Sequence, residues 1–145
     1  MKIGVCCGTD VEKIKYIKSL GYDYAESHCQ EIASAAPDKL EELKNMGLPI
    51  LAANCFIALR VVGKEKDEEA IKEYLERLFS KASCLGLKHL VFGSSAARRI
   101  PEGMSLEQGR AEIVDFLKKD VVPFAEKYNI IIAIEPLRSE ECNAI

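Results

Sequence analysis

The stretch IIAIEPL at residues 131–137 decides the fold of this 145-residue chain. Its four leading residues are apolar and mostly β-branched, which favours a short strand buried on both faces. Pro136 has no backbone N–H and therefore ends the strand, directly after the carboxylate of Glu135. We predict a strand over residues 130–135 that carries a charged side chain at its carboxyl end.

Four further β-rich runs precede this strand, and helical patterns separate them. The runs predict strands over residues 2–6, 22–26, 50–56 and 88–92. The helical patterns cover residues 10–20, 37–46, 67–84 and 105–127. Strand and helix alternate with near-continuous apolar strands, which indicates an α/β fold with a parallel sheet and right-handed crossovers.

Two of the predicted helices carry local signals in their sequences. Thr9 or Asp10 can cap the first helix, and Glu12 completes a capping-box pattern with Thr9. Pro123 lies inside the helical pattern of residues 105–127 and should bend that helix or split off its last turn.

Length and composition describe one globular unit. The 145 residues are 48% apolar and 30% charged, and no linker or low-complexity tract divides them. We therefore expect a single domain over residues 1–145. No stretch approaches the roughly 20 apolar residues that span a bilayer, and no signal peptide is recognisable. We expect no membrane partner and a cytoplasmic location.

Charge, cysteine spacing and missing motifs disfavour several function classes. The net charge of −3 argues against a nucleic-acid partner. The six cysteines form no Cys-x-x-Cys pair, so we interpret them as small buried hydrophobes in a reducing compartment. No Gly-x-Gly-x-x-Gly follows the first strand, which disfavours a nucleotide-binding open sheet. Periodicity alone leaves open both a doubly wound sheet and part of a closed barrel.

The end of the chain resembles a known family. Residues 131–137, followed by Glu141 and Asn143, resemble the fifth-strand signature of xylose-isomerase-like barrels. Within that family the similarity is to sugar (phosphate) isomerases and epimerases, including tagatose/psicose epimerases and hydroxypyruvate isomerases. Earlier segments resemble the family in the same order, at residues 2–5, 21–26, 54–63 and 92–103.

The resemblance implies a fold and an activity. The fold would be the parallel (βα)4-β portion of a (β/α)8 TIM barrel, truncated after strand 5, since a full barrel needs about 250 residues. The activity would be divalent-metal-dependent isomerisation or epimerisation of a small sugar, sugar phosphate or keto acid, by proton transfer through an enediolate. We expect the fragment alone to be inactive.

The resemblance also assigns roles to two glutamates. Glu135 would be a metal ligand and one of the proton-transfer pair, and Glu141 would face the substrate. The other ligands of the family, an Asp, a His and a Glu on strands six to eight, would lie beyond Ile145. The metal would be Mn, Mg or Co, with Zn possible, and we expect the fragment to bind none stably. A capped or ion-paired carboxylate is the structural alternative for Glu135, and an exposed loop residue is the alternative for Glu141.

Further candidate substrate-binding residues follow the earlier strands. Glu26, Asn54, Phe56 and Arg98 could all reach the mouth at which strand ends meet, and Arg98 could clamp a phosphate or carboxylate. Each has a structural alternative: an ion pair for Glu26, a solvated loop or an ion pair for Arg98, and packing for Asn54 and Phe56. His28, just past the predicted second strand, could also face the mouth, but we do not expect it to bind metal.

Other functions remain alternatives. The chain could be a non-catalytic truncated barrel that binds a ligand or associates with a partner half. A polyol dehydratase or an abasic-site endonuclease relative is less favoured, because the third strand offers Asn54 and Cys55 where the nuclease needs histidine. Unpaired edges at strands one and five also predict a homo-oligomer.

Overall fold

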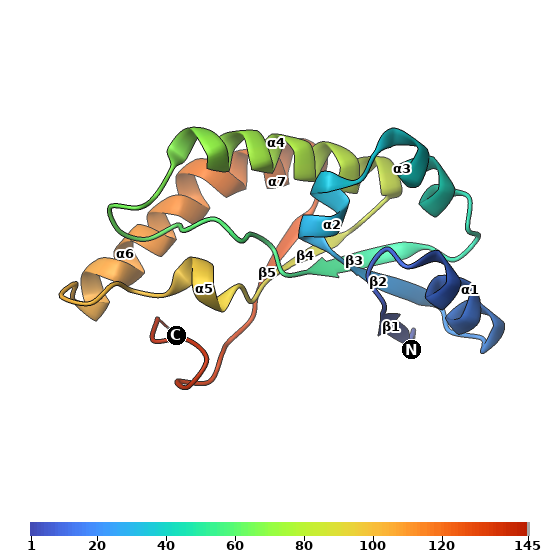
Figure 1. Ribbon diagram of the computed structural model, residues 1–145, viewed down its shortest axis with the longest axis horizontal. Helices are drawn as coiled ribbons and strands as arrows, with labels where there is room; N and C mark the ends of the chain where they lie inside the picture. Colours follow the sequence, from blue (N-terminus) through green and yellow to red (C-terminus); the bar gives the residue numbers. More distant parts are fainter. Residues whose placement is uncertain (145) are drawn as a thin grey trace.

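A computed structural model describes residues 1–144 as one five-stranded sheet with helices packed against it (Figure 1). All neighbouring strands are parallel, in the order β1-β2-β3-β4-β5. The strands are β1 (Gly4–Cys6), β2 (Tyr24–His28), β3 (Ile50–Asn54), β4 (His89–Phe92) and β5 (Ile131–Ile134). The predicted α/β class and parallel sheet are therefore confirmed, with the strand order of the first five strands of a (β/α)8 barrel.

Helical segments connect each strand to the next. They are α1 (Val11–Ser19), α2 (Cys29–Ser34), α3 (Pro37–Lys44), α4 (Glu68–Leu85), α5 (Ser95–Arg98), α6 (Leu106–Phe116), the π-helical segment η1 (Leu117–Val121) and α7 (Val122–Tyr128). Figure 1 shows α2, α3, α4 and α7 on the same side of the sheet. Within residues 1–144, no helix is long and apolar enough to cross a membrane.

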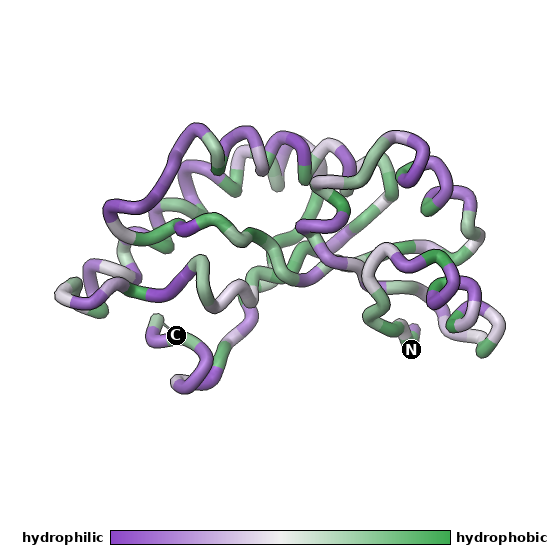
Figure 2. Tube along the Cα trace, in the orientation of Figure 1, coloured by the Kyte–Doolittle hydropathy of each residue, from purple (hydrophilic) through white to green (hydrophobic). Residues whose placement is uncertain are grey.

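The two faces of the sheet differ because side chains alternate along each strand. Strand register aligns one row of residues that is mostly buried beneath the helices, namely Ser27, Ala53, Leu90 and Ile132. The adjacent row lies on the opposite face and consists of Glu26, Ala52, His89 and Ile131. Its residues are half-buried in β2 and β3 and exposed in β4 and β5. Figure 2 shows apolar residues concentrated along the strands and polar residues on the outer turns of the helices.

Local hydrogen bonds explain where the first elements differ from prediction. Asp10 caps α1 by accepting from the backbone N–H groups of Glu12 and Lys13. The predicted capping box with Thr9 does not form, because the Thr9 hydroxyl donates to Glu31 at 2.8 Å instead. Strand β2 begins at Tyr24, two residues later than predicted, after Asp23 has accepted the backbone N–H of Ile3 at 2.7 Å.

Pro123 splits the last helical stretch, as the sequence predicts. The π-helical segment η1 separates α6 from α7, and Val122 donates its backbone N–H to the carbonyl of Leu117. Pro123 follows directly and has no N–H to continue the ladder. The π-helical turn inserts one extra residue, so that Pro123 falls in the first turn of α7. The backbone N–H groups of a first helical turn have no partner within the helix, so the missing N–H of proline costs nothing there.

Candidate functional site

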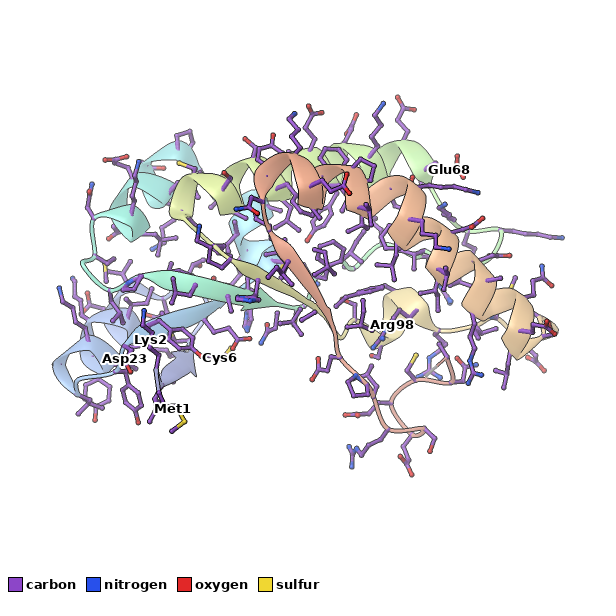
Figure 3. The ribbon with its side chains drawn as sticks, turned by 180° about the vertical axis from the view of Figure 1, so that it is seen from behind. Met1, Lys2, Cys6, Asp23, Glu68 and Arg98 are labelled. Atoms are coloured by element: carbon purple, nitrogen blue, oxygen red, sulfur yellow. The ribbon has the colours of Figure 1, made fainter. Side chains whose placement is uncertain are left out.

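The carboxyl ends of the five strands meet along one edge of the sheet. Cys6 is the last residue of β1, His28 of β2 and Asn54 of β3, while Glu135 directly follows β5. Figure 3 shows Cys6 at the end of β1, and Arg98 on the short helix α5 beside the end of β5. In barrel enzymes this edge forms the mouth of the active site.

Glu135 and Asn54 line the same cavity. The cavity has a volume of about 360 Å³, and its wall is completed mainly by the loop segments after β3 and β4. Gly93 permits the approach of Glu135, since a Cβ atom at Gly93 would lie 1.8 Å from a carboxylate oxygen of Glu135. The fold therefore brings a carboxylate and an amide, both predicted as site residues, to one cavity at the strand ends.

Arg98 lies behind Glu135 and not in the open mouth. Its side chain is completely buried, and its guanidinium carbon lies 5.0 Å from the centre of the Phe92 ring. Its Nη2 donates to the main-chain carbonyl of Glu135 at 3.1 Å, while Nε and Nη1 have no hydrogen-bond partner among residues 1–144. Burial lowers the pKa of the guanidinium. These contacts favour a positioning role for Arg98, and its predicted contact with substrate stays a prediction.

Phe56 belongs to the core. Its ring is completely buried and packs edge-on against Phe79 and Phe92, at centroid distances of 6.3 and 5.5 Å. The chain turns between β3 and Phe56 because Cys55 adopts a positive φ of 52°. These contacts are the packing that the sequence analysis gave as the alternative for Phe56, and its contact with substrate stays a prediction.

The two remaining predicted glutamates lie in different surroundings. Glu26 pairs in register with Cys6 and Ala52, on the exposed face of the sheet. Glu141 is exposed in the loop after β5 and forms an ion pair with Arg138 at 3.3 Å. Hydrogen bonds from the Arg138 side chain and backbone lower the pKa of Glu141. The structure does not bring Glu141 into the cavity lined by Glu135.

A second group of side chains meets at the ends of β1, β2 and β3. The Cys6 Sγ lies 3.7 Å from His28 Nε2 and accepts a hydrogen bond from Asn54 Nδ2 at 3.3 Å. His28 Nδ1 donates to Glu31 at 2.8 Å. The sequence analysis missed this cluster, because its members come from four separate elements and their spacing matches no motif.

Glu31 is held in place by several donors. Its carboxylate accepts from the backbone N–H of Thr9 at 2.7 Å and from the Thr9 hydroxyl at 2.8 Å, in addition to His28. Burial alone raises the pKa of Glu31, but the hydrogen bonds from Thr9 and His28 outweigh burial and the net shift is downward. Glu31 is thus an ionised acceptor at neutral pH.

The described residues do not make a metal centre by themselves. Among residues 1–144, no three His, Cys, Asp or Glu side chains lie close enough together to hold an ion. Glu135 is a suitable oxygen ligand at the mouth. One carboxylate, however, does not fix an ion against water, so the other ligands would have to come from outside these residues.

Comparison with known families gives one match. The family model described as xylose isomerase-like TIM barrel matches residues 14–145. No curated protein matches the chain.

Solved structures share the fold at low sequence identity. 3-Keto-D-glucoside 4-epimerase YcjR from E. coli is 22% identical with a TM-score of 0.74, over 95% of this chain and 57% of that one. D-psicose 3-epimerase from Clostridium cellulolyticum H10, solved with D-tagatose, is 15% identical with a TM-score of 0.80, over 100% and 55%. IolI protein with a bound zinc atom is 21% identical with a TM-score of 0.66, over 99% and 54%. The chain thus spans about half the length of these structures.

Proposed function

Because the chain belongs to the xylose isomerase-like TIM-barrel family, we propose that it supplies the first five strands of a divalent-metal-dependent isomerase or epimerase. Its substrate would be a small sugar, sugar phosphate or keto acid. The observation that carries the proposal is the cavity at the strand ends that Glu135 shares with Asn54. Two structural neighbours named as epimerases support the substrate class.

In the proposed chemistry, the carboxylate of Glu135 is the base that accepts a proton from the substrate. Isomerisation and epimerisation next to a carbonyl both remove a weakly acidic C–H proton, and a carboxylate held against that carbon accepts it. The hydrogen bond from Arg98 to the Glu135 carbonyl fixes the backbone that carries this carboxylate. Asn54 Nδ2 donates one N–H to Cys6, and its second N–H would donate to a substrate oxygen in the same cavity. The metal dependence rests on the chemistry, since a developing enediolate oxygen is stabilised by a cation.

The test uses the polypeptide encoded by the complete reading frame, supplied with Mn²⁺ in ²H₂O. Entry of ²H beside the carbonyl is followed by NMR with a panel of ketohexoses, their phosphates and hydroxypyruvate. We expect exchange with at least one compound, and a loss of about 100-fold or more in Glu135→Gln. Glu140→Gln, five residues away in an exposed loop, is the matched control and should keep full activity.

Two outcomes decide against the proposal. One is exchange that Glu135→Gln leaves unchanged. The other is a native polypeptide of 16.1 kDa that shows no exchange with any compound of the panel. We expect an intact mass about twice that value, since a full barrel needs about 250 residues.

We also propose a cytoplasmic location. All six cysteines are free, and the interpretation of all of them as buried hydrophobes is wrong, because Cys6, Cys55 and Cys84 are exposed. Exposed free thiols persist in a reducing compartment and tend to be oxidised outside the cell.

A further inference from the structure

We propose that Cys6, His28 and Glu31 form a nucleophilic thiol site, in which His28 acts as the general base and Cys6 adds reversibly to the carbonyl carbon of a small aldehyde. The identity of the aldehyde rests on the proposed function, because an aldose in its open form carries this group. The thiol site itself rests only on the geometry of the three side chains.

The first step of the argument is the order of the hydrogen bonds. An ionised carboxylate only accepts, so the 2.8 Å contact between Glu31 and His28 places the proton of neutral His28 on Nδ1. Nε2 is then left as an acceptor, 3.7 Å from the Cys6 sulfur. This is the arrangement of nucleophile, base and orienting carboxylate that activates thiols and hydroxyls in covalent catalysis.

The second step is that other contacts fix the arrangement. Thr9 holds the Glu31 carboxylate with two hydrogen bonds, and Gly8 makes room for it. A Cβ atom at Gly8 would lie 2.8 Å from a Glu31 oxygen, and φ at Gly8 is +64°. Asn54 Nδ2 donates to the Cys6 sulfur at 3.3 Å and so helps to hold the thiol beside His28.

The third step is access to a ligand. Cys6 is exposed and lines a cavity of about 490 Å³ together with His28 and Glu31. The other charged groups on this cavity are already paired nearby: Lys13 with Asp10 at 3.6 Å and Lys39 with Glu42 at 3.0 Å.

Asn54 connects this cavity with the one that contains Glu135. It lines the Glu135 cavity and also donates to Cys6. The Cys6 thiol and the Glu135 cavity therefore share one neighbour, the amide of Asn54.

The chemical step balances without an oxidant or reductant. His28 Nε2 takes the thiol proton as the C–S bond forms between Cys6 and the aldehyde carbon. The π electron pair of the C=O bond moves to oxygen, and the proton passes from His28 to that oxygen. The product is a hemithioacetal, and reversal of the same transfers releases the aldehyde.

The experiment measures alkylation of each cysteine by iodoacetamide at pH 7, with labelled positions assigned by fragment-ion mass spectrometry. Cys84 is exposed on α4 and serves as the internal reference, while buried Cys29 reports on folding and should stay unlabelled. We expect Cys6 to react about tenfold faster than Cys84. His28→Gln should lower the alkylation rate of Cys6 to that of Cys84, and Glu31→Gln should lower it to a value between the two.

A matched control and a ligand arm complete the design. Glu12→Gln makes the same chemical change at an exposed position in the first turn of α1 and should leave the alkylation rate of Cys6 unchanged. An excess of D-glyceraldehyde should slow labelling of Cys6 and not of Cys84, whereas glycerol should protect neither. Equal rates for Cys6 and Cys84 in the unmodified chain would overturn the thiol site, as would a Cys6 rate that His28→Gln leaves intact.

The alkylation experiment distinguishes failure of the thiol site from failure of the proposed isomerase function. Fast labelling of Cys6 that the aldehyde does not slow would refute the addition of Cys6 to an aldehyde, and it would still support a reactive thiol at Cys6. Alkylation needs no turnover, and Glu135→Gln should not change it. An inactive isomerase with a reactive Cys6 would therefore refute only the proposed function.

Discussion

Arg98 carries a positive charge and is nevertheless completely buried. Two of its three guanidinium nitrogens have no hydrogen-bond partner in residues 1–144. A buried donor without a partner loses its hydration and gains nothing in exchange, and burying a charge in this way is costlier still. The contact with the Glu135 carbonyl and the Phe92 ring offsets only part of this cost.

We therefore expect Arg98→Met to stabilise the chain. Met keeps the length and most of the packing, and it removes the two donors without partners. The free energy of unfolding in urea should rise by about 1 kcal/mol. Arg99→Met is the matched control, because exposed Arg99 only donates to the carbonyl of Glu141, and it should change stability little. A loss of stability in Arg98→Met larger than in Arg99→Met would contradict this account.

Single residues also show what the sequence alone could and could not predict. The position of Glu135 at a strand end could be predicted because a strand, a carboxylate and a proline follow one another in the chain, while its metal-binding role is implied only by the family resemblance and stays a prediction. The contact between Cys6 and His28 depends on the register that aligns β1 with β2, and no local pattern encodes that register. The burial of Arg98 was equally hidden, since a charged residue in a Ser-rich loop normally faces water.

At the scale of elements, the helices α2 and α5 were missed while the longer ones were predicted. The first residue of α2 follows His28, whose side chain makes no capping hydrogen bond. Its C-terminal carbonyls, at Ala33 and Ala35, are satisfied by Lys81 of α4, each at 2.7 Å. Such a helix is held by tertiary contacts, which sequence periodicity does not report. By contrast, α4 has a cap, an apolar stripe and a glycine stop within its own sequence.

The cap of α4 leads to the next prediction. Asp67 accepts the backbone N–H of Ala70 at 3.0 Å at the start of this 18-residue helix. Asp67→Ala should lower the free energy of unfolding by about 1 kcal/mol in urea denaturation. Asp67→Asn retains a side-chain oxygen that can accept the same N–H, so its free energy of unfolding should fall much less. Equal losses in the two variants would mean that the side-chain cap is not what stabilises this end of the helix.

At the scale of the whole molecule, β5 leaves apolar surface at an edge of the sheet. Ile131 and Ile134 are 60% and 45% exposed. Beside them lies a cavity of about 380 Å³ whose lining is mainly apolar: Phe92, Arg98, Arg110, Ile113, Val114, Leu117 and Ile134. An unpaired strand edge next to apolar surface favours association with another chain.

We expect this edge to make the chain a homodimer. Light scattering after size exclusion should give about twice 16.1 kDa at micromolar concentration. Ile134→Lys places a charge at the exposed edge and should shift the protein to monomer. Leu106→Lys, at an equally exposed site on α6, should leave the dimer intact. A monodisperse monomer at high concentration would argue against any such pairing.

The sequential order of the strands has a consequence for synthesis. Each strand lies beside the one that precedes it in the chain, from β1 to β5. Within residues 1–144, each strand from β2 to β5 pairs with a strand that has already been synthesised, so this part of the sheet can grow by accretion as the polypeptide leaves the ribosome. The pairing of β1 to β5 in register can therefore be complete as soon as β5 has emerged.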